Sequence, residues 1–263
     1  MRLSLSGFLF EDDYSTQSVG FAEFCEIARC AGYEGVELRR TQIQPDTPKA
    51  ACKELLAIVR DAGLGVTCLT ARGIPSSGDE RDRFFHRYLD LCGDLQCDLL
   101  KIGGDKQWLR QAATIAQEQN VTLAQNNHVG GPLETVAGTR QHFQQINHSN
   151  VMLLYDSMHM NVAGEDYVRC IEELVRITRN ILVHSVRPAT STEQASIERE
   201  GKRWATAMPN EPGVQNWPAI MNQYKRLGYD GLITVIESGW PQQKRRDVAI
   251  YCGQVIRRLW NAR

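Results

Sequence analysis

Several hydrophobic segments of this 263-residue sequence end in side chains that can bind a metal ion or move a proton. The most informative is Val151–Met160, VMLLYDSMHM, in which an apolar run leads into Asp156 and, three residues later, His159. Such a run predicts a strand buried on both faces, although a buried helix has the same pattern. Because burying a carboxylate or an imidazole without a partner is costly, the two side chains indicate a site. An aspartate that caps the next helix, with a histidine bonded to the backbone, explains this segment equally well.

Three further segments have the same arrangement, and together they favour a site. They are Val121–His128 with Asn126, Asn127 and His128, Ile181–Val186 with His184 and Arg187 just beyond it, and Gly231–Glu237 with Glu237 at its end. The carboxyl ends of parallel strands lie on one rim, so these side chains should converge there, with Glu37 and Lys101 from earlier segments. Two carboxylates and an imidazole suit one divalent ion such as Mn²⁺, Mg²⁺, Co²⁺ or Zn²⁺. An ion of this kind polarises a carbonyl or hydroxyl group and holds the substrate against a base.

The elements that must position these side chains alternate regularly along the chain. Four earlier segments favour strands, namely Leu3–Ser6, Tyr33–Leu38, Gly65–Thr70 and Asp98–Ile102. Helical patterns follow the eight strand segments at Phe21–Ala31, 46–63, Ser77–Gly93, Lys106–Gln119, Leu133–Ile146, Asp166–Thr178, Asn216–Leu227 and Arg246–Trp260. Eight repeats of strand and helix in a chain of this length predict an α/β fold, a single-domain (β/α)8 TIM barrel over residues 1–263.

The one irregular connection, Pro188–Gly213, is long and polar. A long loop on the active face of a barrel is typical of a lid or a binding loop. A disordered surface insertion would have the same composition.

Composition excludes several classes of function. The chain has 42% hydrophobic and 23% charged residues and a net charge of −1, which offers no electrostatic field for DNA or an anionic membrane. No apolar stretch has the roughly 20 residues of a membrane span, and the first residues lack the pattern of a signal peptide. We therefore expect a cytoplasmic protein whose partner is a small molecule, and its composition is compatible with a monomer or a homo-oligomer. The eight cysteines form no CxxC pair and are expected to be buried thiols without chemistry.

Taken in order, four motifs resemble the xylose-isomerase-like TIM barrels. They are GYEGVEL at Gly32–Leu38, DSMH at Asp156–His159, the histidine His184, and NEPGVQNW followed by GYDGLITVIE at Gly228–Glu237. That superfamily includes ketose 3-epimerases, hydroxypyruvate isomerase, inosose dehydratases, 3-dehydroshikimate dehydratase and endonuclease IV. The resemblance covers nearly the whole chain.

The resemblance implies that Asp156, His184 and Glu237 bind the metal ion and that His159 contacts the ligands or a substrate oxygen. The family's fourth ligand is a glutamate on strand five, where this sequence has Asn126. The family's epimerases use the glutamates of strands five and eight as paired acid and base. An asparagine oxygen can bind a cation but cannot act as a base, so Glu237 would serve as both ligand and base, with Glu37 as the nearest spare carboxylate.

Arg187 is a second departure, since many family members have an aspartate there. An arginine can hold a carboxylate or phosphate through two hydrogen bonds, which favours an anionic substrate. A salt bridge to Glu37 or Glu237 would explain Arg187 equally well. Three further side chains are expected to contact substrate, namely Arg72, Lys101 and His128.

These observations predict a metal-dependent isomerase or epimerase that acts on a small sugar or polyhydroxylated carbonyl compound through an enediolate. A dehydratase of the same superfamily shares that intermediate, and a barrel that binds a metabolite without full catalysis is a third interpretation. The three-metal endonuclease site is disfavoured, because strands three and four end without histidine.

Overall fold

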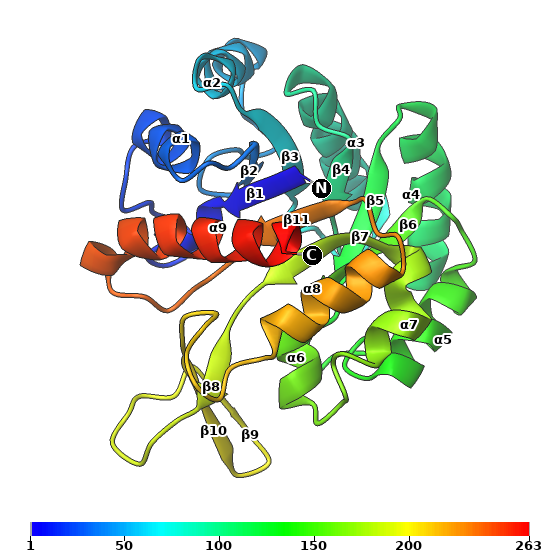
Figure 1. Cartoon of the computed structure of the whole chain (residues 1–263). Helices are drawn as coiled ribbons and strands as arrows, with labels where there is room; N and C mark the ends of the chain where they lie inside the picture. The colour runs from blue at the N-terminus through cyan, green and yellow to red at the C-terminus, as the bar shows by residue number, and fades with distance from the viewer. Residues whose placement is uncertain (1, 263) are drawn as a thin grey trace.

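The computed structural model describes residues 2–262 and contains a closed barrel of eight parallel strands, in the order β1-β11-β7-β6-β5-β4-β3-β2 (Figure 1). The strands are β1 Arg2–Ser6, β2 Gly35–Leu38, β3 Gly65–Thr70, β4 Leu99–Lys101, β5 Thr122–Asn126, β6 Val151–Asp156, β7 Thr178–Val183 and β11 Leu232–Val235. The predicted (β/α)8 TIM barrel is confirmed.

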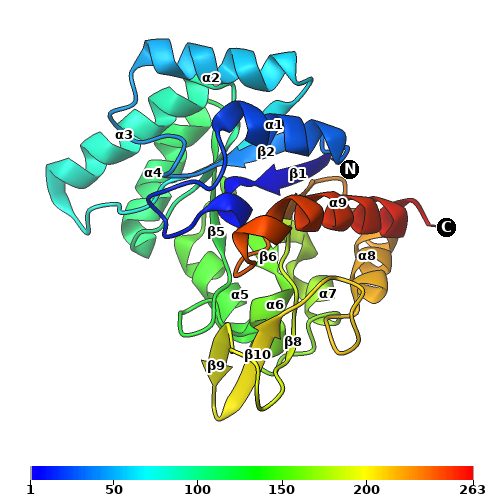
Figure 2. The ribbon, with the colours of Figure 1, turned by 90° about the vertical axis from the view of Figure 1, so that its left-hand side faces the viewer.

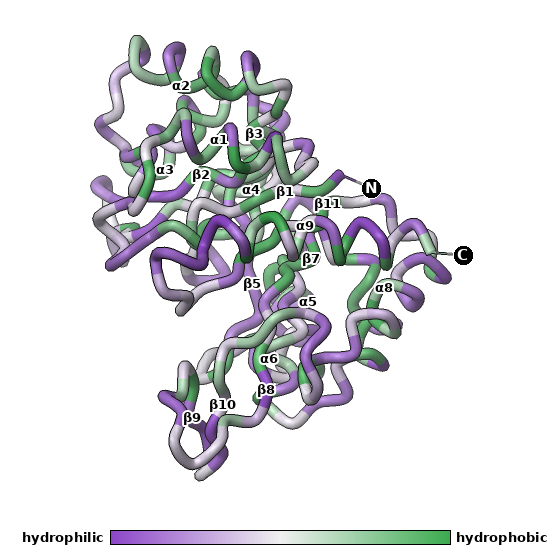
Figure 3. Tube along the Cα trace, turned by 60° about the vertical axis from the view of Figure 1, so that its left-hand side comes forward, coloured by the Kyte–Doolittle hydropathy of each residue, from purple (hydrophilic) through white to green (hydrophobic). Residues whose placement is uncertain are grey.

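Helices cover the outside of the barrel and bury one face each against the strands. They are α1 Phe21–Cys30, α2 Lys49–Asp61, α3 Gly78–Asp94, α4 Lys106–Glu118, α5 Val136–Ile146, α7 Cys170–Leu174, α8 Trp217–Arg226 and α9 Arg245–Asn261. In α1 the buried positions recur with helical spacing, and Gly32 follows with a φ of +80°, the left-handed conformation expected at a helix end. Figure 3 shows the resulting alternation of hydrophilic and hydrophobic residues along α2 and α9. Short 3-10 helices lie at η1 Gly7–Phe10, η2 Val175–Ile177 and η3 Gln242–Lys244.

Alternation along the strands separates two cores. Residues that face outward pack beneath the helices, whereas one apolar layer fills the barrel interior, formed by Cys68, Leu99, Ala124, Leu154, Leu182, Leu232 and Ile236. Two residues further along β4, β5, β6 and β7, the inward positions are Lys101, Asn126, Asp156 and His184. The sequence therefore places four polar side chains on top of the apolar layer, at the carboxyl ends of the strands.

The segment Pro188–Gly213 is ordered, contrary to the interpretation of it as a disordered insertion. It contributes to a three-stranded antiparallel sheet of β8 Val186–Pro188, β9 Ile197–Arg199 and β10 Lys202–Thr206, in the order β8-β10-β9. Figure 2 shows this sheet projecting from the barrel below α6.

A further difference from the sequence-based expectation lies after β6, where the strand ends at Asp156 and a short helix, α6 Ser157–Val162, begins at once. None of the helices in residues 2–262 combines the length and the apolar composition needed to cross a membrane. All eight cysteines are free thiols, and all of them except Cys30 are buried.

Candidate active site

A cavity of about 500 Å³ opens at the carboxyl ends of the barrel strands. Its walls include seven of the ten site residues predicted from the sequence, namely Arg72, Lys101, Asn126, His128, Asp156, His159 and His184. Ser196 and Ile197, from the segment before and at the start of β9, also line it. The small antiparallel sheet thus forms one wall of the cavity, as expected of a binding loop.

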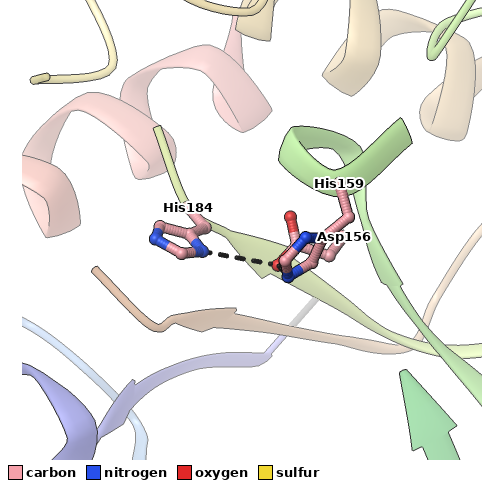
Figure 4. Close-up of side chains that lie close together, drawn as sticks. All are labelled: Asp156, His159 and His184. Atoms are coloured by element: carbon pink, nitrogen blue, oxygen red, sulfur yellow. Dashed lines mark ion pairs between the residues drawn. The ribbon is translucent and has the colours of Figure 1, made fainter. Parts of the chain in front are cut away.

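Asp156, His159 and His184 form the polar centre of this cavity (Figure 4). One donor atom from each lies within 4.8 Å of the others. The Oδ2 atom of Asp156 is 3.5 Å from Nδ1 of His184 and 3.8 Å from Nε2 of His159. Asp156 ends β6, His159 lies on α6, and His184 follows β7.

Local hydrogen bonds hold Asp156 in place. Its Oδ1 atom accepts the backbone N–H of Met158 at 2.9 Å, which caps α6 and brings His159 back over the cavity. The side chain of Asn127 both accepts the backbone N–H of Asp156 and donates to its carbonyl, each at 2.7 Å. Asp156 is therefore both the cap of α6 and a member of the polar centre. The two interpretations of this segment, a functional site and an aspartate that caps the next helix, are compatible.

Burial and mutual charge set the protonation of the three side chains. Burial lowers the pKa of His159 to about 4, so that its imidazole is neutral at neutral pH. Burial also opposes the charged form of His184, but the hydrogen bond to Asp156 and the charge of that carboxylate outweigh it and raise the pKa of His184. Burial favours neutral Asp156, yet the two imidazoles and the Met158 N–H hold its pKa below the usual value.

A divalent ion fits these three donors. Catalytic zinc sites commonly have three protein ligands, drawn from histidine and carboxylate, and keep a fourth position for water or substrate. The remaining nitrogen of His184 lies 3.2 Å from the Ser238 hydroxyl, the kind of outer contact that orients a metal-binding imidazole. The Nδ1 atom of His159 is buried and has no hydrogen-bond partner among the described residues, whereas its Nε2 atom is the one beside Asp156.

Glu237 does not belong to this group of donor atoms. Ile236 belongs to the apolar layer inside the barrel and lines the cavity, and the adjacent Glu237 faces outward. Oε2 of the fully buried Glu237 accepts the backbone N–H of Ser185 at 3.2 Å. Burial raises the pKa of Glu237 to about 7. The structure thus brings His159, in place of Glu237, together with two of the predicted ligands, Asp156 and His184.

Asn126 lines the cavity beside the three donors, and its amide nitrogen donates to the carbonyl of Asn127 at 3.2 Å. His128 is exposed at the rim, where its ring stacks on His159 with the ring centroids 3.9 Å apart. Both side chains therefore lie where the sequence predicted them.

Glu37 is buried behind the cavity wall. Its Oε1 atom accepts the Thr70 hydroxyl at 2.5 Å and lies 3.8 Å from the Arg39 guanidinium, while Oε2 has no partner among the described residues. Arg39 also pairs with Glu11 at 3.1 Å. Arg39 and Glu11 received no role in the sequence analysis, because no motif marked them.

Arg187 does not line the cavity. Its guanidinium makes a bidentate salt bridge to Glu193, with distances of 2.6 and 2.9 Å, and contacts Glu211 at 3.3 Å. A salt bridge was anticipated, but with Glu37 or Glu237, and the actual partners belong to the polar segment itself. The prediction that Arg187 binds an anionic substrate finds no support in this arrangement.

Two aromatic residues and one histidine received no role in the sequence analysis. Phe8 and Tyr14 line the cavity, although nothing in their spacing marked them. His142 is buried, and its Nε2 atom lies 2.7 Å from Oε1 of Gln125. The signal that could have found His142 is its position on the apolar face of α5, next to Phe143.

Comparison with known proteins identifies the family. The family profile described as xylose isomerase-like TIM barrel matches residues 25–251, which is most of the chain. The chain belongs to this family.

The individual proteins that this chain resembles are distant from it in sequence. An inosose dehydratase of Mesomycoplasma hyopneumoniae is 23% identical over 133 residues, which cover 49% of this chain and 44% of that protein. A crystal structure of D-psicose 3-epimerase in the presence of D-fructose has a TM-score of 0.75, with 14% identity and full coverage of both chains. The probable 3-DHS dehydratase AsbF from Bacillus anthracis has a TM-score of 0.74, with 16% identity over 98% of this chain and 99% of that one. At such identities the structural likeness shows the fold alone.

Proposed function

We propose that this protein is a metal-dependent isomerase or epimerase of a small sugar or polyhydroxylated carbonyl compound, acting through an enediolate. The observation that carries the proposal is the convergence of Asp156, His159 and His184 in the cavity at the barrel mouth. Family membership supports it, and the solved structures of similar fold include a sugar epimerase and a probable dehydratase.

In this proposal Asp156, His184 and His159 hold the ion, with Asn126 beside it. When bound, the ion polarises the carbonyl next to the carbon that loses its proton. The low pKa of His159 leaves its imidazole neutral, which suits either a third ligand or a contact to a substrate oxygen. Glu37 lies behind the cavity wall and serves the site indirectly, because its Oε1 atom accepts the Thr70 hydroxyl and lies beside the guanidinium of Arg39, and both of these residues line the cavities.

A dehydratase is the second candidate, and one feature of the cavity favours it. Among the described residues, Asp156 is the one carboxylate that lines the cavity, since Asn126 and Ile236 occupy the ends of β5 and β11. Epimerisation by paired carboxylates on opposite faces of a sugar needs two bases. Elimination of water needs one base and a leaving hydroxyl, and the curated relatives that match part of this chain are inosose dehydratases.

The proposal is tested by exchange of carbon-bound hydrogen. The protein with Mn²⁺, Mg²⁺, Co²⁺ or Zn²⁺ is incubated in D2O with ketoses and cyclic polyhydroxylated ketones, and NMR follows deuterium uptake next to the carbonyl. We expect uptake of about one ion per chain, with micromolar affinity or better, and exchange that requires it. Formation of a conjugated product that absorbs in the ultraviolet would identify the dehydratase.

Two variants give the controls. Asp156→Asn should lose both ion binding and exchange, whereas Glu37→Gln, a change behind the cavity wall, should retain ion binding and lower the rate of exchange only in part. Exchange that persists in Asp156→Asn, or a wild-type protein that takes up none of the four ions, would contradict the proposal.

A further inference from the structure

A second cavity, of about 330 Å³, adjoins the first at the carboxyl ends of β3, β4 and β5. The two cavities share four lining residues, namely Arg39, Arg72, Lys101 and Asn126. A molecule whose reacting carbons lie beside Asp156 can therefore extend past Lys101 into the second cavity.

The charged side chains that line the second cavity are all positive. Three cationic side chains line it, and no carboxylate does so among residues 2–262. Arg39 is already neutralised, because Glu11 and Glu37 contact its guanidinium. Arg72 and Lys101 are left as two positive charges without an acidic partner in the described part of the chain.

Arg72 is held in place by an aromatic ring. Its guanidinium lies 3.5 Å above the centroid of the Tyr14 ring, which in turn stacks on Phe8 at 5.6 Å. Stacking occupies the face of a guanidinium and leaves its N–H edge able to donate hydrogen bonds. The side chain is exposed at the rim, so a ligand can reach that edge.

Lys101 is half-buried at the end of β4 and makes no hydrogen bond or ion pair within residues 2–262. Burial lowers its pKa, and the nearby charge of Glu37 offsets part of that effect. An ammonium group removed from water without a partner is unfavourable. An anion in the second cavity would supply the partner that the protein itself lacks.

We infer that the second cavity is a subsite for an oxyanion, a phosphate or a carboxylate carried by the substrate, bound by Lys101 and Arg72. The inference rests on the proposed function for the position of the rest of the substrate. Arg187 was expected to recognise negative charge, but it pairs with Glu193 and Glu211. The inference assigns that recognition to Lys101 and Arg72, which have no acidic partner among the described residues. The carboxylate and the phosphate share the same chemistry of recognition, and the experiment separates them.

The test compares three probes of matched shape: D-fructose, D-fructuronate and D-fructose 6-phosphate. Calorimetry measures their affinities for the purified protein, before and after chelation, so that binding through a metal ion is distinguished from binding to the subsite. We expect at least one anionic probe to bind about tenfold or more tightly than D-fructose, since hydrogen bonds to charged groups discriminate to this extent. The stronger of the two anions identifies the group.

Lys101→Gln and Arg72→Gln should each lower the ratio of the affinity for the anionic probe to the affinity for D-fructose, from about tenfold or more towards one. The matched controls are Lys53→Gln on α2 and Arg83→Gln on α3, which remove the same charges from exposed positions and should keep the preference. Arg72 is exposed, so its variant should fold even where a change at Lys101 does not.

Equal binding of all three probes by the wild type would overturn the subsite and leave the proposed function standing. A preference that persists in both variants, or falls equally in the controls, would also overturn it. Binding of inorganic phosphate that depends on Lys101 and Arg72, without binding of any sugar, would support the subsite and contradict the sugar-like substrate. Absence of binding by every probe and by phosphate would overturn the subsite.

Discussion

At the end of β11, an apolar side chain faces the cavity and the neighbouring carboxylate does not. Ile236 faces the interior and the adjacent Glu237 faces the helix layer. On β5 and β6 the corresponding inward positions are Asn126 and Asp156. A site with four charged or imidazole ligands would need a carboxylate at the end of β5 and another at the end of β11. The cavity has the amide of Asn126 and the apolar side chain of Ile236 at these two positions.

The first prediction concerns Asn126. Asn126→Glu should raise the affinity for a divalent ion by about tenfold or more, because it adds a charged oxygen beside Asp156. Asn126→Gln, which keeps an amide, is the control and should change the affinity little. Calorimetric titration with Mn²⁺ measures both. Unchanged affinity in Asn126→Glu would mean that this side chain does not face the ion.

The second prediction concerns the proton on Glu237. Its folded-state pKa, raised from 4.5 to about 7 by burial, means that the folded state holds the proton more tightly than the unfolded state. The carboxyl group thus contributes its full stability below about pH 4.5, and that contribution is lost as pH rises through about 7. Relative to Glu237→Gln, the wild type should lose about 2–3 kcal/mol between these limits.

Urea unfolding of both proteins at pH 4.5 and pH 8, in the presence of a chelator, measures this difference. A free-energy gap between wild type and Glu237→Gln that stays the same at both pH values would show that Glu237 titrates normally.

At the scale of the elements, the sequence patterns predicted the barrel and most of its strand ends. Apolar runs followed by polar residues are strong signals, because a strand covered on both faces has to be apolar until it reaches the rim. The small sheet of β8 to β10 carries no such run, since its strands are three to five residues long and mostly half-buried. Pattern alone therefore left it as a loop.

The register of a strand was harder to predict than its existence. GLITVIE contains no polar residue on either face before Glu237 except Thr234, so the letters do not say which face turns inward. The structure decides it through the pairing of Leu232 with Asn180 and Val235 with Val183. A shift of the register by one residue would put Glu237 into the cavity. The role predicted for Glu237 therefore depended on the register of β11, which the motif does not determine.

The third prediction belongs to the small sheet. Arg187 on β8 forms ion pairs with Glu193 and with Glu211, and so connects β8 to the segment around Glu193 and to the turn that contains Glu211. Arg187→Ala should make the bonds between residues 189 and 200 more sensitive to limited proteolysis. Partly exposed ion pairs contribute little to global stability, so the melting temperature should change by only a few degrees. Lys202→Ala on β10 is the control, and equal cleavage of both variants would contradict this role for Arg187.

At the scale of the whole molecule, the two ends of the chain close the barrel together. β1 pairs with β11 from Arg2 opposite Leu232 to Leu5 opposite Val235, and α9 packs against α1 and β1 (Figure 1). The hydroxyl of Tyr33, just before β2, donates to the carbonyl of Ala249 on α9 at 2.7 Å. The cavity thus depends on contacts between the first and the last elements, because all eight strand ends form its rim.

The last prediction tests this closure with two helical glycines. A Cβ atom at Gly253 on α9 would lie 3.1 Å from the carbonyl oxygen of Ala31 and from the Tyr33 ring, whereas one at Gly93 on α3 would meet nothing within 4 Å. Gly253→Leu should destabilise the fold by about 1–3 kcal/mol or more, because the buried contact between α9 and the start of β2 has no room. Gly93→Leu should be neutral or stabilising by up to about 1 kcal/mol, since leucine favours a helix over glycine. Thermal unfolding measures both, and similar changes in the two variants would show that α9 does not pack tightly against the first strands.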